Sequence, residues 1–332
     1  MDNKSSSLPL PFRVALIGAG GFFGTNLARH LAPRVSELRC FGLHPSFPEA
    51  LSGLTWITGN MADAPLAEAL TGCDTVIHLA SSSSPGTDLD ITADAQANVI
   101  ASLRLFDHCV AAGVKQVVFI SSGGTVYGIP GHVPIPESAP TQPITAYGVA
   151  KLAIEKYLEV YSRLRGLDYR VLRISNLYGP YQTTIKKQGV IAAFLSEALR
   201  GEPLEIWGDG RVVRDYVYVT DAAEAVLAAM RHQGTERVFN IGGGIGMSIN
   251  DVIAAIETML GRNLEKTYKP GRTVDVPVNI LDCALAKLEL GWQPKTIFSD
   301  GLRNTADWMD NWLQDQRVET RHVQPVISAY RP

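Results

Sequence analysis

The feature that most constrains the fold is a glycine-rich loop between a strand-like run and a helix-like run. Residues 14–17 are continuously apolar, as expected of a strand buried on both faces of a parallel sheet. Gly18, Gly21 and Gly24 follow, and apolar residues then recur at helical spacing from Phe23 onwards. Glycines in such a loop allow a tight turn and the close approach of a pyrophosphate to the helix N-terminus. We therefore expect a dinucleotide to bind at this loop.

Strand-like and helix-like segments continue to alternate through the first half of the chain. The strand-like segments are residues 38–43, 75–80, 116–120 and 169–174, and the longer helix-like segments are residues 98–112 and 147–165. Repeated alternation of this kind predicts an α/β fold with a Rossmann-like, doubly wound parallel sheet.

Beyond Asn176 the chain is broken more often by glycine and proline, which indicates a smaller, interleaved C-terminal substrate lobe. We expect residues 12–176 to form the dinucleotide-binding domain, with a later segment at about 212–242 returning to it. Residues 177–315 would form mainly the substrate-binding lobe, including a final helix over about 301–313. Residues 316–332 would be a polar tail.

Composition argues against several classes of partner. The net charge of −3 and the lack of a Lys/Arg-rich run argue against nucleic acid. The four cysteines are scattered without metal-ligand spacing, so we expect no metal site and the reduced thiols of a cytoplasmic protein. The polar N-terminal stretch lacks the apolar segment of a signal peptide, and no apolar run reaches membrane-spanning length. We expect a soluble chain with no membrane partner.

The identity of the cofactor is left open by one position. In NAD-binding folds the second strand usually ends in an acid that holds the ribose 2′-hydroxyl, but Gly42 stands there. NAD is expected, and NADP is not excluded. Asn60 either hydrogen-bonds the adenine or is simply a turn residue. The other positions expected to contact the cofactor are Phe22, Phe23, Met61, Leu79, Ala80, Ser81 and Asn98.

A tyrosine and a lysine stand four residues apart at the start of a predicted helix. This spacing places the side chains of Tyr147 and Lys151 on one helix face. An ammonium beside a phenol favours the phenolate, and so lowers a pKa that is about 10 in free tyrosine. Tyr147 is therefore expected to act as a general base near neutral pH.

Several motifs together resemble a known family. The glycine loop is followed in order by the 121–128 run (Ser-Ser-Gly-Gly-Thr-Val-Tyr-Gly), Tyr147-x-x-x-Lys151, the 176–180 turn (Asn-Leu-Tyr-Gly-Pro) and the 214–216 triplet (Arg-Asp-Tyr). The chain resembles the extended short-chain dehydrogenases, and within them the UDP-glucose 4-epimerase branch of the NAD-dependent epimerase/dehydratase family. The resemblance covers nearly everything from Arg13 to Leu313.

The resemblance implies a Ser or Thr hydroxyl that assists the tyrosine, but Gly123 occupies its usual place. Either Ser122 or Thr125 takes this role, with Ser122 favoured, or Tyr147 acts without one. Sugar-nucleotide dehydratases of this kind carry acids at the positions of Gly124 and Thr125, and decarboxylating relatives usually have a Glu in this loop. Elimination and decarboxylation are therefore disfavoured.

The resemblance also implies contacts with a substrate diphosphate from Asn176, Arg214 and Arg272, and guanidinium groups suit phosphate oxygens. Asp215 and Asp275 are expected to orient neighbouring groups. The glycines of residues 242–246 read as a tight turn rather than a phosphate loop, because Ser248 and Asp251 form a helix-capping pattern after them.

These observations predict a sugar-nucleotide epimerase that acts at C4 of a UDP-sugar through a transient 4-keto intermediate, with bound NAD. An NADP-dependent reductase of a keto-sugar nucleotide is one alternative, and a non-catalytic NAD(P)-binding sensor is another. The resemblance implies a homodimer that pairs residues 98–112 and 147–165 with their copies in the other subunit.

Overall fold

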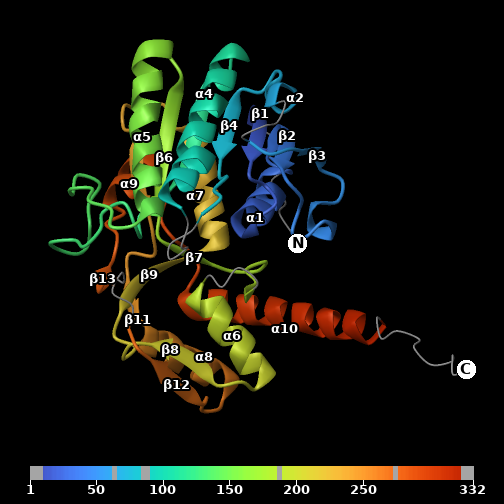
Figure 1. Ribbon diagram of the computed structural model, residues 1–332, viewed down its shortest axis with the longest axis vertical. Coiled ribbons are helices and arrows are strands. Elements are labelled where there is room, and N and C mark those ends of the chain that lie inside the picture. The colour runs from blue at the N-terminus through green and yellow to red at the C-terminus, as the bar shows by residue number, and fades with distance from the viewer. Residues whose placement is uncertain (1–9, 62–65, 84–89, 185–188, 272–275, 323–332) are drawn as a thin grey trace, which may run out of the picture.

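A computed structural model describes residues 10–61, 66–83, 90–184, 189–271 and 276–322. The centre of the first lobe is a seven-stranded sheet in which every neighbouring pair is parallel (Figure 1). In spatial order its strands are β3 (Thr55–Thr58), β2 (Val35–Gly42), β1 (Leu10–Ile17), β4 (Thr75–His78), β5 (Gln116–Ser122), β6 (Asp168–Ile174) and β10 (Val238–Ile241). The order reverses direction at β1, which is the doubly wound arrangement that the sequence predicts.

Helices cover both faces of this sheet. On one face, α1 (Phe22–Leu31), α7 (Val219–Arg231) and α9 (Ala284–Leu290) share a buried apolar cluster with the strands. On the other face, α2 (Leu66–Leu70), α4 (Ala101–Ala111) and α5 (Ala146–Arg165) share a second cluster. The alternating strand and helix pattern is thus explained by a sheet whose two faces are both buried.

The second lobe lies beyond the carboxyl ends of the central strands (Figure 1). Its sheet contains β11 (Gly246–Ser248), β9 (Val213–Tyr218) and β13 (Val278–Asn279), with β7 (Asn176–Tyr178) also paired to β9. A separate parallel pair joins β8 (Leu204–Trp207) to β12 (Lys266–Lys269). The helices α6 (Val190–Arg200), α8 (Ile249–Leu260) and α10 (Phe298–His322) complete this lobe.

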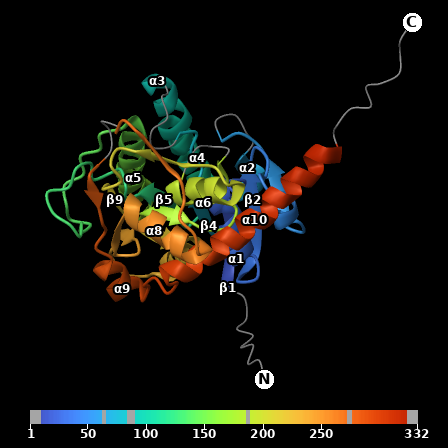
Figure 2. The same ribbon diagram turned by 90° about the horizontal axis from the view of Figure 1, so that it is seen from below.

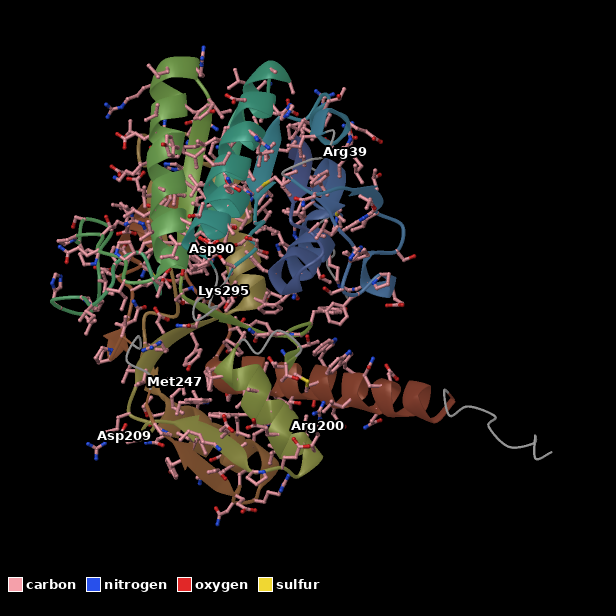
Figure 3. All side chains as sticks on the ribbon, in the orientation of Figure 1. Arg39, Asp90, Arg200, Asp209, Met247 and Lys295 are labelled. Atoms are coloured by element: carbon pink, nitrogen blue, oxygen red, sulfur yellow. The ribbon has the colours of Figure 1, made fainter. Side chains whose placement is uncertain are left out.

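The chain passes between the lobes more than once. After β9 it returns to the first lobe through α7 and β10, and later through α9. Lys295, which Figure 3 labels at the junction of the lobes, donates its backbone N–H to Asp221 of α7 at 3.2 Å. The expected returning segment at 212–242 needs one correction, because residues 213–218 form β9 of the second sheet.

Two helix termini test the predictions made from sequence. The capping box of Ser248 and Asp251 is present at the start of α8, as expected. The last helix was predicted to end near Leu313, but α10 continues to His322. Residues beyond Leu313 are polar and carry no apolar stripe, so hydrophobic periodicity gave no sign of this extension. Among the described residues, no helix combines the length and apolarity that crossing a membrane requires.

Candidate active site

The glycine loop joins β1 to α1 at the carboxyl edge of the central sheet. Gly18 has φ of 93°, and a Cβ there would lie 2.6 Å from the backbone nitrogen of Ala80. Both the backbone conformation and the contact with the chain after β4 therefore require glycine. Gly24 is buried, and a Cβ at that position would meet the carbonyl oxygen of Ala19 at 2.5 Å. These two contacts hold the loop against the chain after β4 on one side and against α1 on the other.

The N-terminus of α1 has the form of an anion site. Gly21 occupies the N-cap position without a side-chain cap, and a Cβ there would meet no atom within 4 Å. Helix N-terminal amides attract phosphate groups. Phe23 is buried and Phe22 packs partly against the same core, and both lie in the first turn of α1. This cradle fits the pyrophosphate of a dinucleotide.

The end of β2 carries a glycine where an acid is usual. A Cβ at Gly42 would make only ordinary van der Waals contact, with its nearest neighbour the ring of Trp56 on β3 at 3.4 Å. Gly42 accepts a backbone hydrogen bond from Gly59 at 2.9 Å. Asn60 and Met61 follow at the same edge of the sheet, where Asn60 is exposed and Met61 is buried.

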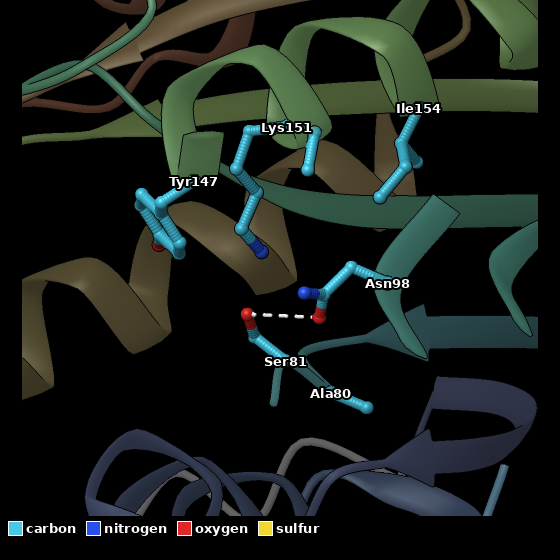
Figure 4. Close-up of a pocket in the computed structure, with 7 residues that line it drawn as sticks. Ala80, Ser81, Asn98, Tyr147, Lys151 and Ile154 are labelled. Atoms are coloured by element: carbon cyan, nitrogen blue, oxygen red, sulfur yellow. Dashed lines mark hydrogen bonds between the residues drawn. The ribbon is translucent and has the colours of Figure 1, made fainter. Parts of the chain in front are cut away.

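A small pocket lies between α5 and the chain after β4 (Figure 4). Tyr147 and Lys151 point into it from one face of α5, as their spacing predicts. The ammonium nitrogen of Lys151 lies 5.6 Å from the centre of the Tyr147 ring and donates to the Ile120 carbonyl at 2.9 Å. The pocket is lined by Ala80, Ser81, Asn98, Tyr147, Ala150, Lys151 and Ile154.

Asn98 lies in a π-helical turn, η2 (Ala95–Ile100), that follows the short helix α3 (Ile91–Asp94). Such turns occur often at functional sites. The buried Asn98 amide donates to Asp94 Oδ1 at 2.9 Å and accepts the Ser82 backbone N–H at 2.8 Å. It also accepts from the Ser81 hydroxyl at 3.3 Å. Asn98 therefore fixes the segment after β4, where Leu79 packs against the core and Ala80 and Ser81 reach the pocket.

The pKa of Tyr147 corrects one expectation. Burial raises this pKa to about 12, although a hydrogen bond with the Ser122 side chain acts in the opposite direction. Proximity to the lysine favours the phenolate, but the loss of solvent around the phenol disfavours it. Burial also lowers the pKa of Lys151 to about 8, and the Glu155 carboxylate opposes that shift. Tyr147 therefore depends on neighbouring groups to stabilise its anion.

The structure distinguishes the two candidate hydroxyls. Ser122, at the end of β5, interacts with Tyr147 through its side chain and acts to lower the pKa of the phenol. The Thr125 hydroxyl is buried without a hydrogen-bond partner, and Thr125 packs beneath Gly148 in the first turn of α5. A side chain at Gly123 would be crowded, because its Cβ would meet Leu281 Cδ1 at 2.5 Å and the Arg173 carbonyl at 3.0 Å. Leu281, from a distant part of the sequence, would have to shift to admit a hydroxyl at position 123.

A buried polar network next to Lys151 was missed by the sequence analysis. Glu155, one turn further along α5, pairs with Arg173 of β6 at 2.7 Å and accepts the Ser121 hydroxyl at 2.5 Å. Arg173 also donates to Tyr127 at 2.9 Å, and Tyr127 donates to Asn240 at 2.7 Å. The network joins α5 to β5, β6 and β10. Its only sequence signal is the helical spacing of Glu155 from Lys151.

The expected diphosphate residues lie on the sheet of the second lobe. Asn176 and Arg214 belong to the paired strands β7 and β9, and Asn176 donates to the Asp215 carbonyl at 3.0 Å. The Arg214 guanidinium donates to the carbonyls of Val213 and Val276. Arg272 and Asp275 lie outside the described residues.

Asp215 acts on the backbone, as expected. Its carboxylate accepts the N–H groups of Gly243 at 2.6 Å, Gly244 at 3.3 Å and Leu281 at 3.1 Å. Burial raises the pKa of Asp215 to about 6, opposed by these three hydrogen bonds. The amides of the 242–246 turn thus already bind a carboxylate of the chain itself, which agrees with a structural turn.

Comparison with known proteins gives consistent results. Residues 14–242 match the NAD dependent epimerase/dehydratase family. The chain is 33% identical to the UDP-glucose 4-epimerase of Mycolicibacterium smegmatis, over 91% of this chain and 100% of that one. The structure of a Thermotoga maritima UDP-glucose 4-epimerase with UDP-glucose has a TM-score of 0.86 and 37% identity, and covers 91% of this chain and 99% of its own. That of a Thermus thermophilus UDP-glucose 4-epimerase with NAD has a TM-score of 0.81 and 31% identity, covering 90% and 98%.

Proposed function

The chain belongs to the NAD-dependent epimerase/dehydratase family, and from this premise we propose that it is a nucleotide-sugar epimerase that inverts C4 of a UDP-sugar. The observation that carries the proposal is that the side chains of Ser122 and Lys151 both lie beside that of Tyr147. The Ser122 side chain interacts with Tyr147 and favours its anion, and the ammonium nitrogen of Lys151 lies 5.6 Å from the centre of the Tyr147 ring. This is the arrangement needed to remove and return the proton of a sugar hydroxyl.

Tyr147 accepts the proton of the C4 hydroxyl in this mechanism. Ser122 donates a hydrogen bond to the reacting oxygen or to the phenolate, which stabilises whichever oxygen carries the charge. Lys151 stabilises the phenolate electrostatically, and its pKa of about 8 keeps most of it protonated near neutral pH. NAD, when bound, would supply reversible hydride transfer at C4, and inversion requires the keto sugar to turn in the site so that its other face is presented for the return. Because the reaction has no net redox change, the protein should retain its cofactor.

Residues of the first lobe would hold the dinucleotide. Gly18, Gly21 and Gly24 form the pyrophosphate cradle, and the chain around Asn60, Met61 and Leu79 to Ser81 borders it. Asn98 fixes that border, and Lys151 would hold the nicotinamide ribose. In the second lobe, Asn176 and Arg214 with Arg272 would bind the diphosphate of the substrate, since guanidinium groups match phosphate oxygens.

Incubation of the purified enzyme with UDP-glucose, UDP-galactose and their N-acetyl and uronate forms tests this proposal. Chromatography should show interconversion of one epimeric pair without added oxidant, and Tyr147→Phe should abolish it. Net consumption of NADPH with a keto-sugar nucleotide would identify the reductase instead. Tight NAD(P) binding without turnover of any of these compounds would favour the sensor.

We further propose a cytoplasmic homodimer. The four cysteines are free thiols, which suits a reducing compartment. One face of α5 exposes Val149, Tyr157, Val160 and Leu164, and Ile100 is exposed at the end of η2, directly before α4. Such a run of apolar side chains is typical of a protein interface. Light scattering at micromolar concentration should give twice the mass of the chain.

A further inference from the structure

Four segments that are distant in the sequence meet around the ring of Tyr181, at the boundary between the lobes. The centre of this ring lies 5.0 Å from that of Phe47 and 5.2 Å from that of Trp308 on α10. The Phe47 and Trp308 rings are 5.6 Å apart in an edge-to-face arrangement. The guanidinium of Arg29 on α1 lies 5.5 Å from the Tyr181 ring centre. We call Phe47, Tyr181 and Trp308 the aromatic bridge.

The backbone at the bridge is held in an unusual conformation. Tyr181 is a non-glycine residue with φ of 69°, which a bulky side chain rarely adopts. The preceding carbonyl, that of Pro180, accepts a hydrogen bond from the Asn26 amide of α1 at 2.8 Å. A conformation of this kind persists only where the surrounding contacts impose it. The chain after β7 is therefore pinned to the helix that forms the pyrophosphate cradle.

The other end of the bridge is attached to the glycine loop. Phe47 lies in the segment after β2, and the N–H of neighbouring Ser46 donates to the Gly20 carbonyl at 2.9 Å. In doubly wound folds the end of the second strand borders the adenosine ribose of the cofactor. Trp308, by contrast, belongs to α10, which runs beneath α1 and β2 from the second lobe (Figure 2).

We propose that the aromatic bridge retains the dinucleotide, by holding the segment after β2 against the second lobe. The proposal rests on the function given above, because an epimerase regenerates its cofactor and gains nothing from releasing it. Phe47, Tyr181 and Trp308 are positioning residues in this proposal. They act on the rate of cofactor release and leave the proton and hydride transfers unchanged.

The test measures release of the cofactor itself. Full-length protein is loaded with radiolabelled NAD, chased with excess unlabelled NAD, and separated from free nucleotide over time. Phe47→Ala and Trp308→Ala should each speed release about tenfold, since aromatic pairs of this kind stabilise structures measurably. Turnover at saturating NAD should stay within about twofold of wild type. Tyr268→Ala, which removes an exposed ring of the second lobe away from the bridge, should release NAD at the wild-type rate.

Trp308 is the decisive position because it belongs to α10 rather than to the dinucleotide-binding lobe. The double variant Phe47→Ala/Trp308→Ala should release NAD no faster than the quicker single variant, since both substitutions break one connection. The bridge would be overturned if Phe47→Ala speeds release and Trp308→Ala does not. Additive effects in the double variant would overturn it as well. The same holds if the wild-type protein binds no dinucleotide. Accelerated release in a protein that epimerises none of the sugar nucleotides would support the bridge and reject the proposed reaction.

Discussion

The Ser122 side chain at the end of β5 interacts with Tyr147 in the first turn of α5 and opposes the rise that burial causes in the pKa of Tyr147. No other hydroxyl of the 121–125 loop that the structure describes is placed in the same way. Ser121 donates to Glu155 on the far side, and the Thr125 hydroxyl is buried beneath α5. This relationship favours Ser122 as the assisting hydroxyl, a choice that the sequence leaves open between two residues.

Ser122→Ala should lower kcat by about a hundredfold, because general acid–base groups and their hydrogen-bonding partners contribute at least this much. The matched control is Thr125→Val, which removes the unpartnered hydroxyl while keeping the shape of the side chain. That variant should keep kcat and be equally or slightly more stable, since it removes an unsatisfied buried group. Steady-state kinetics on both variants would decide the assignment, and a large loss from Thr125→Val would reverse it.

Lys151→Met should abolish turnover and yet raise stability near neutral pH by about 1–3 kcal/mol, because a buried cation is removed. Burial lowers the folded-state pKa of Lys151 to about 8, below its unfolded value. Below about pH 8 both states are protonated, so the penalty is fully present. Between about 8 and 10.5 the unfolded state binds more protons than the folded one, so wild-type stability rises with pH.

Urea unfolding of wild type and Lys151→Met at several pH values would measure this difference. The advantage of the variant should be greatest below about pH 8 and should shrink as the pH approaches about 10.5. A stability advantage that is independent of pH over this range would show that burial does not lower the pKa of Lys151.

Glu155→Gln should destabilise the protein by about 3–5 kcal/mol, because it leaves the Arg173 guanidinium buried without its charged partner. The matched control lies one turn further along the same helix. Glu159→Gln breaks only the exposed pair with Arg163 and should change stability by less than about 1 kcal/mol. Chemical denaturation measures both. The double variant Glu155→Gln/Arg173→Met should recover much of the loss, and failure to recover would point to packing rather than charge.

Gly123→Ser would restore a hydroxyl at the usual position of the family, but we expect it to destabilise the fold by about 1–3 kcal/mol. Its Cβ would meet Leu281 Cδ1 and the Arg173 carbonyl. Leu281→Ala creates a cavity and is destabilising on its own. The two substitutions combined should cost less than their sum, because each relieves the defect of the other. Additive losses in a double-mutant cycle would show that Leu281 is not the obstacle.

Much of the fold could be predicted from the sequence because its signals are local. The apolar run of residues 14–17, the glycine spacing and the alternation of strands and helices determine a parallel, doubly wound sheet. Helical spacing alone places Tyr147 and Lys151 on one face. The capping pattern of Ser248 and Asp251 fixes the start of α8 in the same way.

Only the tertiary structure decided which groups those residues meet. Burial raises the pKa of Tyr147, against the effect of Ser122, where proximity to Lys151 alone predicts a fall. Leu281 fills the space beside Gly123, and Phe47 meets Trp308 from the opposite end of the chain. The physical reason is that periodicity and spacing act over a few residues. Burial, charge pairing and ring contacts depend instead on segments that become neighbours only when the sheet and its two lobes have formed.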